Sequence, residues 1–304
     1  MHKFYLDTWS LTKKTVSSFM EDDSFSYAGS IAFSTIFSLP AILLITLSIG
    51  STFYEQKAVQ QQLIDQIGGL IGMKNTLEIE KILSNASMDM SSTLAHVIGI
   101  WTLIFSATTV FVALQSSLNN MWGIKPKPQK GLLKYIINRL LSFAMVASFG
   151  FILLISLIAD AILFAFQKLV LHYFDGLGSV ILFALNLVIS LGIITIVFAL
   201  LFKVLPDAKI RWRDVWVGAF ITTLLFTIGK YLIGLYLGNS SITSAYGAAG
   251  SIVIILIWVY YSTVIFLFGA EFTSVHAAES GRPIEPSEHA VRFVITEIPN
   301  KKDL

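Results

Sequence analysis

The chain has 304 residues, of which 55% are hydrophobic and 13% are charged, and its net charge is +2. Soluble globular proteins carry about 25% charged residues, so this chain has too few charges to coat a water-solvated surface. Its composition therefore excludes a soluble globular protein and predicts an all-α membrane protein. Cysteine is absent, which excludes disulfides, thiolate metal sites and cysteine nucleophiles.

Residues 1–23 are predicted to form an amphipathic interfacial helix on the cytoplasmic side of the membrane. Apolar residues recur there at helical spacing, and Trp9 suits the depth of the lipid headgroups. A short, partly ordered leader is the alternative. The residues that can share the apolar face are Tyr5, Trp9, Val16, Phe19 and Met20.

A six-helix transmembrane domain is predicted over residues 24–278. About 20 apolar residues cross a hydrocarbon core about 30 Å thick, and five stretches of sufficient length carry one charge or none. The last stretch, residues 215–270, is too long for one crossing, and turn-forming residues from Gly238 to Ser244 divide it in two. The expected spans are residues 25–53, 93–118, 140–167, 179–202, 215–237 and 249–272.

The loop between the first two spans, residues 55–89, is expected to be helical. Apolar residues at helical spacing predict a helix over residues 58–71, and a second short helix is expected over 77–84. A packed connector is the favoured interpretation of this outer loop; a cover over a cavity, contact with the outer leaflet and contact with a second subunit are alternatives. Residues 279–304 contain three prolines and are predicted to be a poorly ordered cytoplasmic tail.

The distribution of lysine and arginine predicts that both termini are cytoplasmic. In a six-span arrangement, sixteen of these residues lie on the side of the two termini and three lie in the outer loop. The chain is therefore expected to cross a membrane several times and to keep both ends on its cytoplasmic side.

Charged side chains within the apolar spans are the main candidates for function, because each is costly at the centre of a bilayer. Lys230 and Asp160 are expected on the outer side of the fifth and third spans, where they can pair, share a water-filled pocket or extend to the outer interface. Glu271 closes the sixth span near the cytoplasm, where a capped, partly solvated residue at a helix end is the more common explanation. Gln115 and Asn186 are polar candidates that commonly hydrogen-bond between helices.

Two backbone features are also predicted from the sequence. Pro40 lies inside the first span and should kink it, and Gly234 and Gly238 form a G-x-x-x-G pair that permits close helix packing. Catalysis has little support, because the five histidines are scattered and no nucleophile, metalloprotease or nucleotide-binding motif is present. No cofactor, metal or enzymatic activity is expected.

Several motifs follow one another along the chain in a specific order. They are A-G-S-I-A-F-S-T-I-F-S-L-P over residues 28–40, L-P-D at 205–207, R-W-R-D-V-W-V-G-A over 211–219, G-K at 229–230, A-Y-G-A-A-G over 245–250 and F-G-A-E over 268–271. Over about residues 15–280 the chain resembles the YihY/BrkB family of bacterial inner-membrane proteins. The resemblance implies a six-span inner-membrane protein with a cytoplasmic N-terminus.

The resemblance also marks a set of polar positions. Lys230, Tyr246 and Glu271 are the candidates for a solute pathway, whereas a cap of the fifth span is the favoured explanation of Asp214. Some relatives carry a ribonuclease BN label, which this sequence argues against, because no soluble catalytic domain, metal cluster or basic groove is evident. The remaining family-like positions are Asp22, Asp23, Pro206, Asp207 and Trp212.

Three functions are compatible with these features. The favoured one is translocation of a lipid or small charged solute through a polar cavity between helices. A non-transporting scaffold in envelope assembly is the alternative, and a ribonuclease is the least favoured. The expected partners are membrane lipids and an unidentified lipid or small molecule, with no nucleic acid, and a homo-oligomer is compatible with the sequence.

Overall fold

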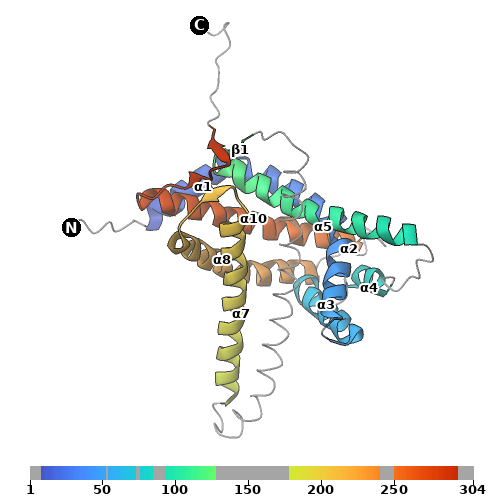
Figure 1. The fold of residues 1–304 in the computed structure, drawn as a ribbon. Helices are drawn as coiled ribbons and strands as arrows, with labels where there is room; N and C mark the ends of the chain where they lie inside the picture. The colour runs from blue at the N-terminus through green and yellow to red at the C-terminus, as the bar shows by residue number, and fades with distance from the viewer. Residues whose placement is uncertain are drawn as a thin grey trace.

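A computed structural model describes residues 8–52, 54–72, 76–84, 93–127, 178–239 and 250–293. These residues are mostly helical (Figure 1). The helices are α1 (Thr8–Glu21), α2 (Ser24–Gly50), α3 (Gln56–Ile71), α4 (Leu77–Ser84), α5 (Thr93–Met121), α7 (Gly178–Val204), α8 (Trp212–Asn239) and α10 (Gly250–Glu279). The strands are β1 (Ile124–Pro126), β2 (Ala208–Lys209), β3 (Glu285–Pro286) and β4 (Ala290–Arg292).

Four helices among the described residues are long and apolar enough to cross a membrane. They are Ser24–Gly50, Ala184–Val204, Trp212–Leu237 and Gly250–Glu279, which correspond to the expected first, fourth, fifth and sixth spans. The place of the expected second span is taken by α5, a helix of 29 residues that is not among these four. The expected third span, residues 140–167, lies outside the described residues.

The first two helices are separated by Asp23. Its backbone is left-handed, with φ of 52°, a conformation that Asp tolerates better than most residues. The Ser26 hydroxyl donates a hydrogen bond of 2.9 Å to the Asp23 carboxylate, which holds the first turn of α2 against this residue. The chain therefore changes direction between α1 and α2, and Asp23 has a conformational role at this point.

The two faces of α1 differ from the expected division. Leu11, Thr15 and Phe19 are buried, whereas Trp9 and Met20 are exposed. Phe19 was expected on the outward apolar face with Trp9, but its ring packs edge-on against Phe268 of α10 at 5.6 Å. That part of the prediction is wrong, because the spacing of Leu11, Thr15 and Phe19 defines a second apolar face that contacts the protein.

Helices α8 and α10 cross closely in the core. A methyl group added to Gly218 of α8 would overlap the Thr273 hydroxyl of α10, and one added to Gly269 of α10 would overlap the Thr222 hydroxyl of α8. Both threonine hydroxyls donate back to a carbonyl of their own helix, so no polar group is stranded at the contact. The reciprocal pairing shows that the helices are antiparallel and that small residues allow their close approach.

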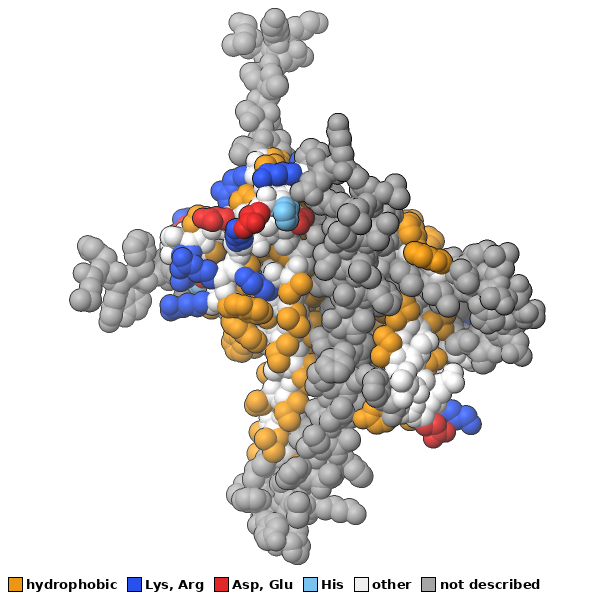
Figure 2. Space-filling model, in the orientation of Figure 1, with side chains coloured by type: hydrophobic (Ala, Val, Ile, Leu, Met, Phe, Trp, Pro, Cys, Tyr) orange, Lys and Arg blue, Asp and Glu red, His pale blue; other side chains and the backbone are white. Residues whose placement is uncertain are grey.

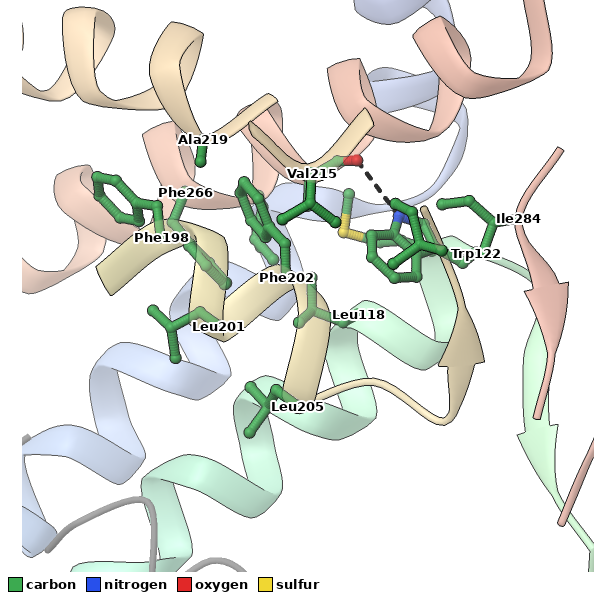
Figure 3. Packing of buried hydrophobic residues seen from close by; sticks show 14 of the residues in the cluster. Leu118, Trp122, Phe198, Leu201, Phe202, Leu205, Val215, Ala219, Phe266 and Ile284 are labelled. Atoms are coloured by element: carbon green, nitrogen blue, oxygen red, sulfur yellow. Dashed lines mark hydrogen bonds between the residues drawn. The ribbon is translucent and has the colours of Figure 1, made fainter. Parts of the chain in front are cut away.

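Aromatic side chains fill the core beside this crossing (Figure 3). Phe202 of α7 stacks on Phe266 of α10 at 5.2 Å, and Phe198 lies edge-on to Phe226 of α8 at 5.6 Å. The Trp122 indole, which follows α5, donates a hydrogen bond of 3.3 Å to the Ala270 carbonyl. This first apolar cluster therefore joins α5, α7, α8 and α10.

Pro40 lies inside α2, which remains helical from Ser24 to Gly50. Two residues before it, the Ser38 hydroxyl donates to the Ser106 carbonyl of α5 at 2.6 Å and to the Ser34 carbonyl at 2.9 Å. A buried serine thus links α2 and α5 near the proline, whose ring removes one backbone donor from the helix.

The outer-loop helices α3 and α4 pack against the end of α2 (Figure 1). They contribute to a second apolar cluster with the ends of α8 and α10 that lie far from β1–β4. The helices have the expected positions, and their apolar residues are buried as in a packed connector. The members of this cluster from α3 and α4 are Val59, Leu63, Ile64, Ile71, Ile79 and Leu83.

Residues 280–293, which follow α10, contain two strands, contrary to the prediction of a poorly ordered segment. β1 pairs with β4 and β2 pairs with β3, each pair antiparallel. Backbone bonds extend the pairing, including one of 2.9 Å from the Ser287 amide to the Asp207 carbonyl. The prolines favour an extended chain, and the loops after α5 and α7 offer unpaired backbone groups to it. The fold is therefore helical with two small sheets.

We call this region, β1–β4 with residues 203–214 and 279–293, the polar end of the molecule. Figure 2 shows most of the visible Lys and Arg side chains gathered there, with hydrophobic side chains along the helices. The segments that the six-span prediction puts on one side of the membrane are thus adjacent in the fold. Which side they face stays a prediction.

Candidate functional site

A cavity of about 420 Å³ lies at the polar end, between the α7–α8 connection and the segment that follows α10. Its shape depends on a glycine. At the end of α10, Gly281 has φ of 69°, and the Arg282 amide donates to the Ala277 carbonyl at 2.9 Å. This is the usual way in which glycine ends a helix. The residues that line the cavity are Lys203, Ala208, Lys209, Ile210, Arg211, Gly281, Arg282, Pro283 and Glu285.

The lining carries four cationic side chains and one carboxylate. Lys209 is paired with Glu288 at 3.1 Å, and Lys203 donates to the Ile210 carbonyl and lies 5.6 Å from the centre of the Trp212 ring. In the described part of the chain, neither Lys203 nor Arg211 forms an ion pair. Among the described residues, the lining therefore has two cations outside ion pairs and one carboxylate, Glu285, a balance suited to an anion.

Asp214 holds the two walls of this cavity together. It is buried in the first turn of α8, and Arg282 donates to its carboxylate at 2.8 Å. The Nδ1 atom of His276 lies 3.6 Å from the same oxygen, and the second oxygen, Oδ2, has no hydrogen-bond partner among the described residues. An acidic side chain in the first turn of a helix is also stabilised by the helix dipole. The hydrogen bond to the Asp214 carboxylate, however, comes from Arg282. The ion pair thus positions a cavity residue.

A second group of polar side chains joins α5 to the α7–α8 connection. Asn119 donates to the Asp207 carboxylate at 2.9 Å and accepts from the Asp207 amide at 2.8 Å, and Gln115 donates to the same carboxylate at 3.4 Å. Asn119 was missed in the sequence, although its position one turn after Gln115 places both on one helix face. Pro206, next to Asp207, is buried. Gln115, predicted in a solute pathway, here contributes to a structural contact.

A third group is a carboxyl pair where α1, α2 and α10 meet. Glu271 is buried on α10, with 4% of its surface exposed, and Asp22 is half-buried between α1 and α2. Burial raises the pKa of Asp22, and the charge of Glu21 raises this pKa further.

Lys230 lies apart from these groups. It is half-buried on α8, and the preceding residue, Gly229, faces Tyr261 of α10. Lys230 is therefore about ten residues, or about 15 Å, from the level of Glu271 along the antiparallel pair. Within the described ranges the structure does not bring Lys230 and Glu271 into one cavity, and Lys230 forms no ion pair there. Asp160 and Tyr246 lie outside the described residues.

The other predicted positions have different outcomes. Asn186 is exposed on α7. Trp212 packs near Trp216, with ring centres 6.4 Å apart. A methyl group added to Gly234 would meet no atom within 4 Å. The close packing that the Gly234–Gly238 pair permits is found among the described residues at Gly218 and Gly269 instead. Gly238 lies in the same helix as Gly234.

From the sequence, the basic residues of the cavity served only to predict the orientation of the chain in the membrane. They were not recognised as a binding site. The signal available was the cluster of basic residues between the fourth and fifth spans, but the cavity also needs Arg282, which follows α10. Among the described residues, no group of three or more His, Asp or Glu side chains is arranged to hold a metal ion.

The apolar helices and the charged end that joins them define a multi-pass helical membrane protein. The family described as virulence factor BrkB matches residues 15–292, and the chain belongs to this family. It is 30% identical to a UPF0761 membrane protein of Alteromonas mediterranea, over 90% of this chain and 89% of the relative. No solved structure matches the chain.

Two further relatives are longer. The chain is 26% identical to a UPF0761 membrane protein of Alkalilimnicola ehrlichii, over 86% of this chain and 57% of the relative. It is 24% identical to one of Saccharophagus degradans, over 92% of this chain and 62% of the relative. The chain thus spans less than two thirds of the length of these two relatives. The names identify all three relatives as membrane proteins.

Proposed function

We propose that the protein binds an anionic lipid headgroup or small anionic solute in the basic cavity and moves it across the inner membrane. The observation that carries the proposal is the lining of the cavity, in which two of the four cations, Lys203 and Arg211, form no ion pair among the described residues. The proposal places the polar end in the cytoplasm, in agreement with the excess of Lys and Arg on that side. It involves no chemical conversion of the ligand and no cofactor.

The chemistry of the lining favours phosphate or carboxylate. An arginine side chain presents a planar set of donors that matches two oxygens of either group, and a lysine adds a compact charge. The volume of about 420 Å³ falls in the usual range for small-ligand pockets, about 300–1,000 Å³. Such a cavity accommodates a headgroup or a small solute but not a folded nucleic acid.

The position of the cavity supports movement across the membrane as well as binding. Its residues lie at the ends of α7, α8 and α10, three of the helices able to cross a membrane. Further along α8, Lys230 offers a second positive charge about 27 Å from Trp212 at the start of this helix. An anionic group can therefore meet cationic side chains at the start of one membrane-spanning helix and again about two thirds of the way along it.

The test uses purified protein in phosphatidylcholine liposomes that contain a trace of fluorescent phosphatidylglycerol. Transfer of the labelled lipid between leaflets is measured by chemical quenching from outside, and uptake of radiolabelled inorganic phosphate is measured in parallel. We expect Arg211→Gln to lower the rate for the preferred anion about tenfold, the equivalent of one charge-assisted hydrogen bond. Arg213→Gln is the matched control, since Arg213 is exposed nearby but does not line the cavity.

The outcomes separate the functions. Phospholipid transfer without phosphate uptake identifies a lipid as ligand, and the reverse identifies a solute. Binding without transfer of any probe overturns translocation and favours the scaffold alternative. Equal loss in Arg211→Gln and Arg213→Gln overturns the cavity as the site, provided that thermal unfolding shows both variants to be folded.

A further inference from the structure

A row of exposed aromatic side chains begins beside the basic cavity and continues along α8. Trp212 is 48% exposed, Trp216 44% and Phe220 51%. Their spacing of four residues places them on one face of the helix, and the rings of Trp212 and Trp216 lie 6.4 Å apart. We call these three residues the aromatic row. From Trp212 to Phe220 it covers about 12 Å of α8.

One lysine connects the aromatic row to the cavity. Lys203 lines the cavity, and its Nζ atom lies 5.6 Å from the centre of the Trp212 ring. Arg211, which also lines the cavity, immediately precedes Trp212 in the sequence. Figure 2 shows hydrophobic side chains directly beside the basic side chains of the polar end. The cationic lining and the aromatic row therefore form one continuous surface.

The depth of this surface suits a phospholipid. Lys203 is in the last turn of α7 and Trp212 begins α8, so each lies at the end of a helix able to cross a membrane. Tryptophan side chains are concentrated at the level of the lipid headgroups, and Phe220 lies farther along α8, toward the acyl chains. A lipid phosphate at the cavity thus leaves its glycerol and acyl chains beside the aromatic row.

A soluble anion would use only part of this surface. Lysine and arginine side chains satisfy its charge, but it gains nothing from apolar rings that extend into the bilayer. Trp9 supplies a comparison within the chain. It is 66% exposed and Lys13 lies 5.2 Å from the centre of its ring, but neither residue lines the cavity. Trp9 therefore has the features of an ordinary interfacial tryptophan, whereas Trp212 adjoins an anion site.

We infer that the cavity and the aromatic row together bind one anionic phospholipid, with the phosphate between Lys203 and Arg211 and the acyl chains along the aromatic row. The inference rests on the proposed anion site and names the class of its ligand. Trp212 and Trp216 favour a lipid over a soluble anion, because their rings offer apolar contact that only the acyl part of a ligand can use. A zwitterionic lipid is disfavoured, because its second headgroup charge is repelled by the cations.

The first experiment measures binding to the purified full chain in detergent. Native mass spectrometry follows a titration with phosphatidylglycerol, and equilibrium dialysis follows radiolabelled inorganic phosphate as the soluble probe. We expect Arg211→Gln to bind phosphatidylglycerol about tenfold more weakly through loss of a charge-assisted hydrogen bond, and Trp212→Ala about fivefold more weakly through loss of apolar contact. Phosphate binding should be the same in Trp212→Ala and the native protein. Trp212→Phe should retain lipid binding, and Trp9→Ala is the matched control.

The outcomes separate this inference from the proposed function. Weaker lipid binding in Arg211→Gln but not in Trp212→Ala overturns the lipid site and keeps the anion site. Equal losses in Trp212→Ala and Trp9→Ala also overturn the lipid site, because they reduce the effect to general anchoring in the membrane. No loss in any variant removes the proposed anion site as well. Thermal unfolding shows whether each variant is folded.

The second experiment leaves the aromatic row unchanged. A phosphatidylglycerol with a diazirine near the glycerol end of one acyl chain is added to the native protein in phosphatidylcholine nanodiscs, and peptide mass spectrometry locates the photoadducts. We expect adducts within residues 212–220 to exceed those of a phosphatidylcholine probe of the same design. The excess should disappear in Arg211→Gln and remain in Arg213→Gln, since Arg213 does not line the cavity. Equal labelling by the two probes overturns the inference, because it shows only the lipid that surrounds any membrane protein.

Discussion

The polar end and the α3–α4 region illustrate two ways of holding connections between membrane helices. At the polar end, ion pairs, amide–carboxylate bonds and four short strands hold the connections. In the α3–α4 region, buried Val, Leu and Ile side chains pack against the ends of three long helices. The difference teaches that burial alone can order a connection, whereas a charged cavity requires directed polar contacts around it.

The two regions also differ in what they leave unpaired. Among the described residues, Asp214 and Glu271 each have one buried carboxylate oxygen without a hydrogen-bond partner, whereas the corresponding atom beside the second apolar cluster is the neutral indole nitrogen of Trp258. A buried polar atom without a partner costs more free energy when it belongs to a charged group. The predictions below test this comparison, from the largest expected effect to the smallest.

Arg282→Gln should produce the largest loss of stability. It leaves the buried Asp214 without its cationic partner, at an expected cost of about 4 kcal/mol in the free energy of unfolding. Thermal unfolding of the purified protein in nanodiscs measures the change. The double variant Arg282→Gln with Asp214→Asn should recover much of the loss, and a double variant as unstable as the single one would contradict the ion-pair explanation.

Leu83→Ala tests the apolar region in the same assay. Leu83 is 1% exposed in the second apolar cluster, and truncation of a buried leucine costs about 3 kcal/mol. Rates of anion movement at a temperature where the variant is folded should equal those of the native protein. A loss of anion movement in the folded variant would show that the α3–α4 region takes part in function. This region would then no longer differ from the polar end in that respect.

Gly218→Ala examines the helix crossing that supports the polar end. The added methyl group would overlap Thr273, and overpacking of this kind costs about 2 kcal/mol. Gly234→Ala on the same helix is the matched control, because its methyl group meets no atom within 4 Å and alanine favours the helix. Equal unfolding temperatures for the two variants would contradict the close crossing.

Asp22 and Glu288 should affect the pH dependence of stability in opposite directions. The pKa of Asp22 is raised, so the folded state binds this proton more tightly, and its contribution to stability is lost as pH rises through the folded pKa. The pKa of Glu288 is lowered, first by its hydrogen bond from Lys209 and then by the charge of that lysine, so its contribution is lost as pH falls through the folded pKa.

Urea unfolding at a series of pH values measures both contributions. In Asp22→Asn, the free energy of unfolding should fall less steeply as the pH rises above the usual pKa of Asp. Glu288→Gln should slightly flatten the acid limb, because Glu288 is exposed. Unchanged pH profiles in Asp22→Asn would argue against a tightly held proton at the α1–α2 connection.

Much of the fold could be predicted because its signals are long. Runs of more than 20 apolar residues predict α2, α7, α8 and α10, and apolar spacing predicts α3 and α4. The strands could not be predicted, because segments of two or three residues such as β2 and β3 are too short to show alternation. Their order comes from pairing partners about 75 residues away in sequence, Lys209 with Glu285.

The site was only partly predictable for a related reason. Asp22, Asp207, Asp214 and Glu271 stand out as family-like acids, but their partners are distant in sequence. Asp214 needs Arg282, 68 residues later, and Asp207 needs Asn119, 88 residues earlier. The Gly218–Thr273 contact was missed because single glycines and threonines are common in apolar helices, and no spacing within one helix identifies the partner.

The turn at Gly281 has a consequence for how the protein is made. Residues 281–285 complete the wall of the cavity, and the ribosome adds them after every described helix. During synthesis the basic residues of the α7–α8 connection therefore cannot contact residues 281–285 until α10 has been inserted. A nascent chain halted before Gly281 would contain the described helices but could not assemble the cavity. An intact cavity therefore indicates that synthesis has continued past the turn at Gly281.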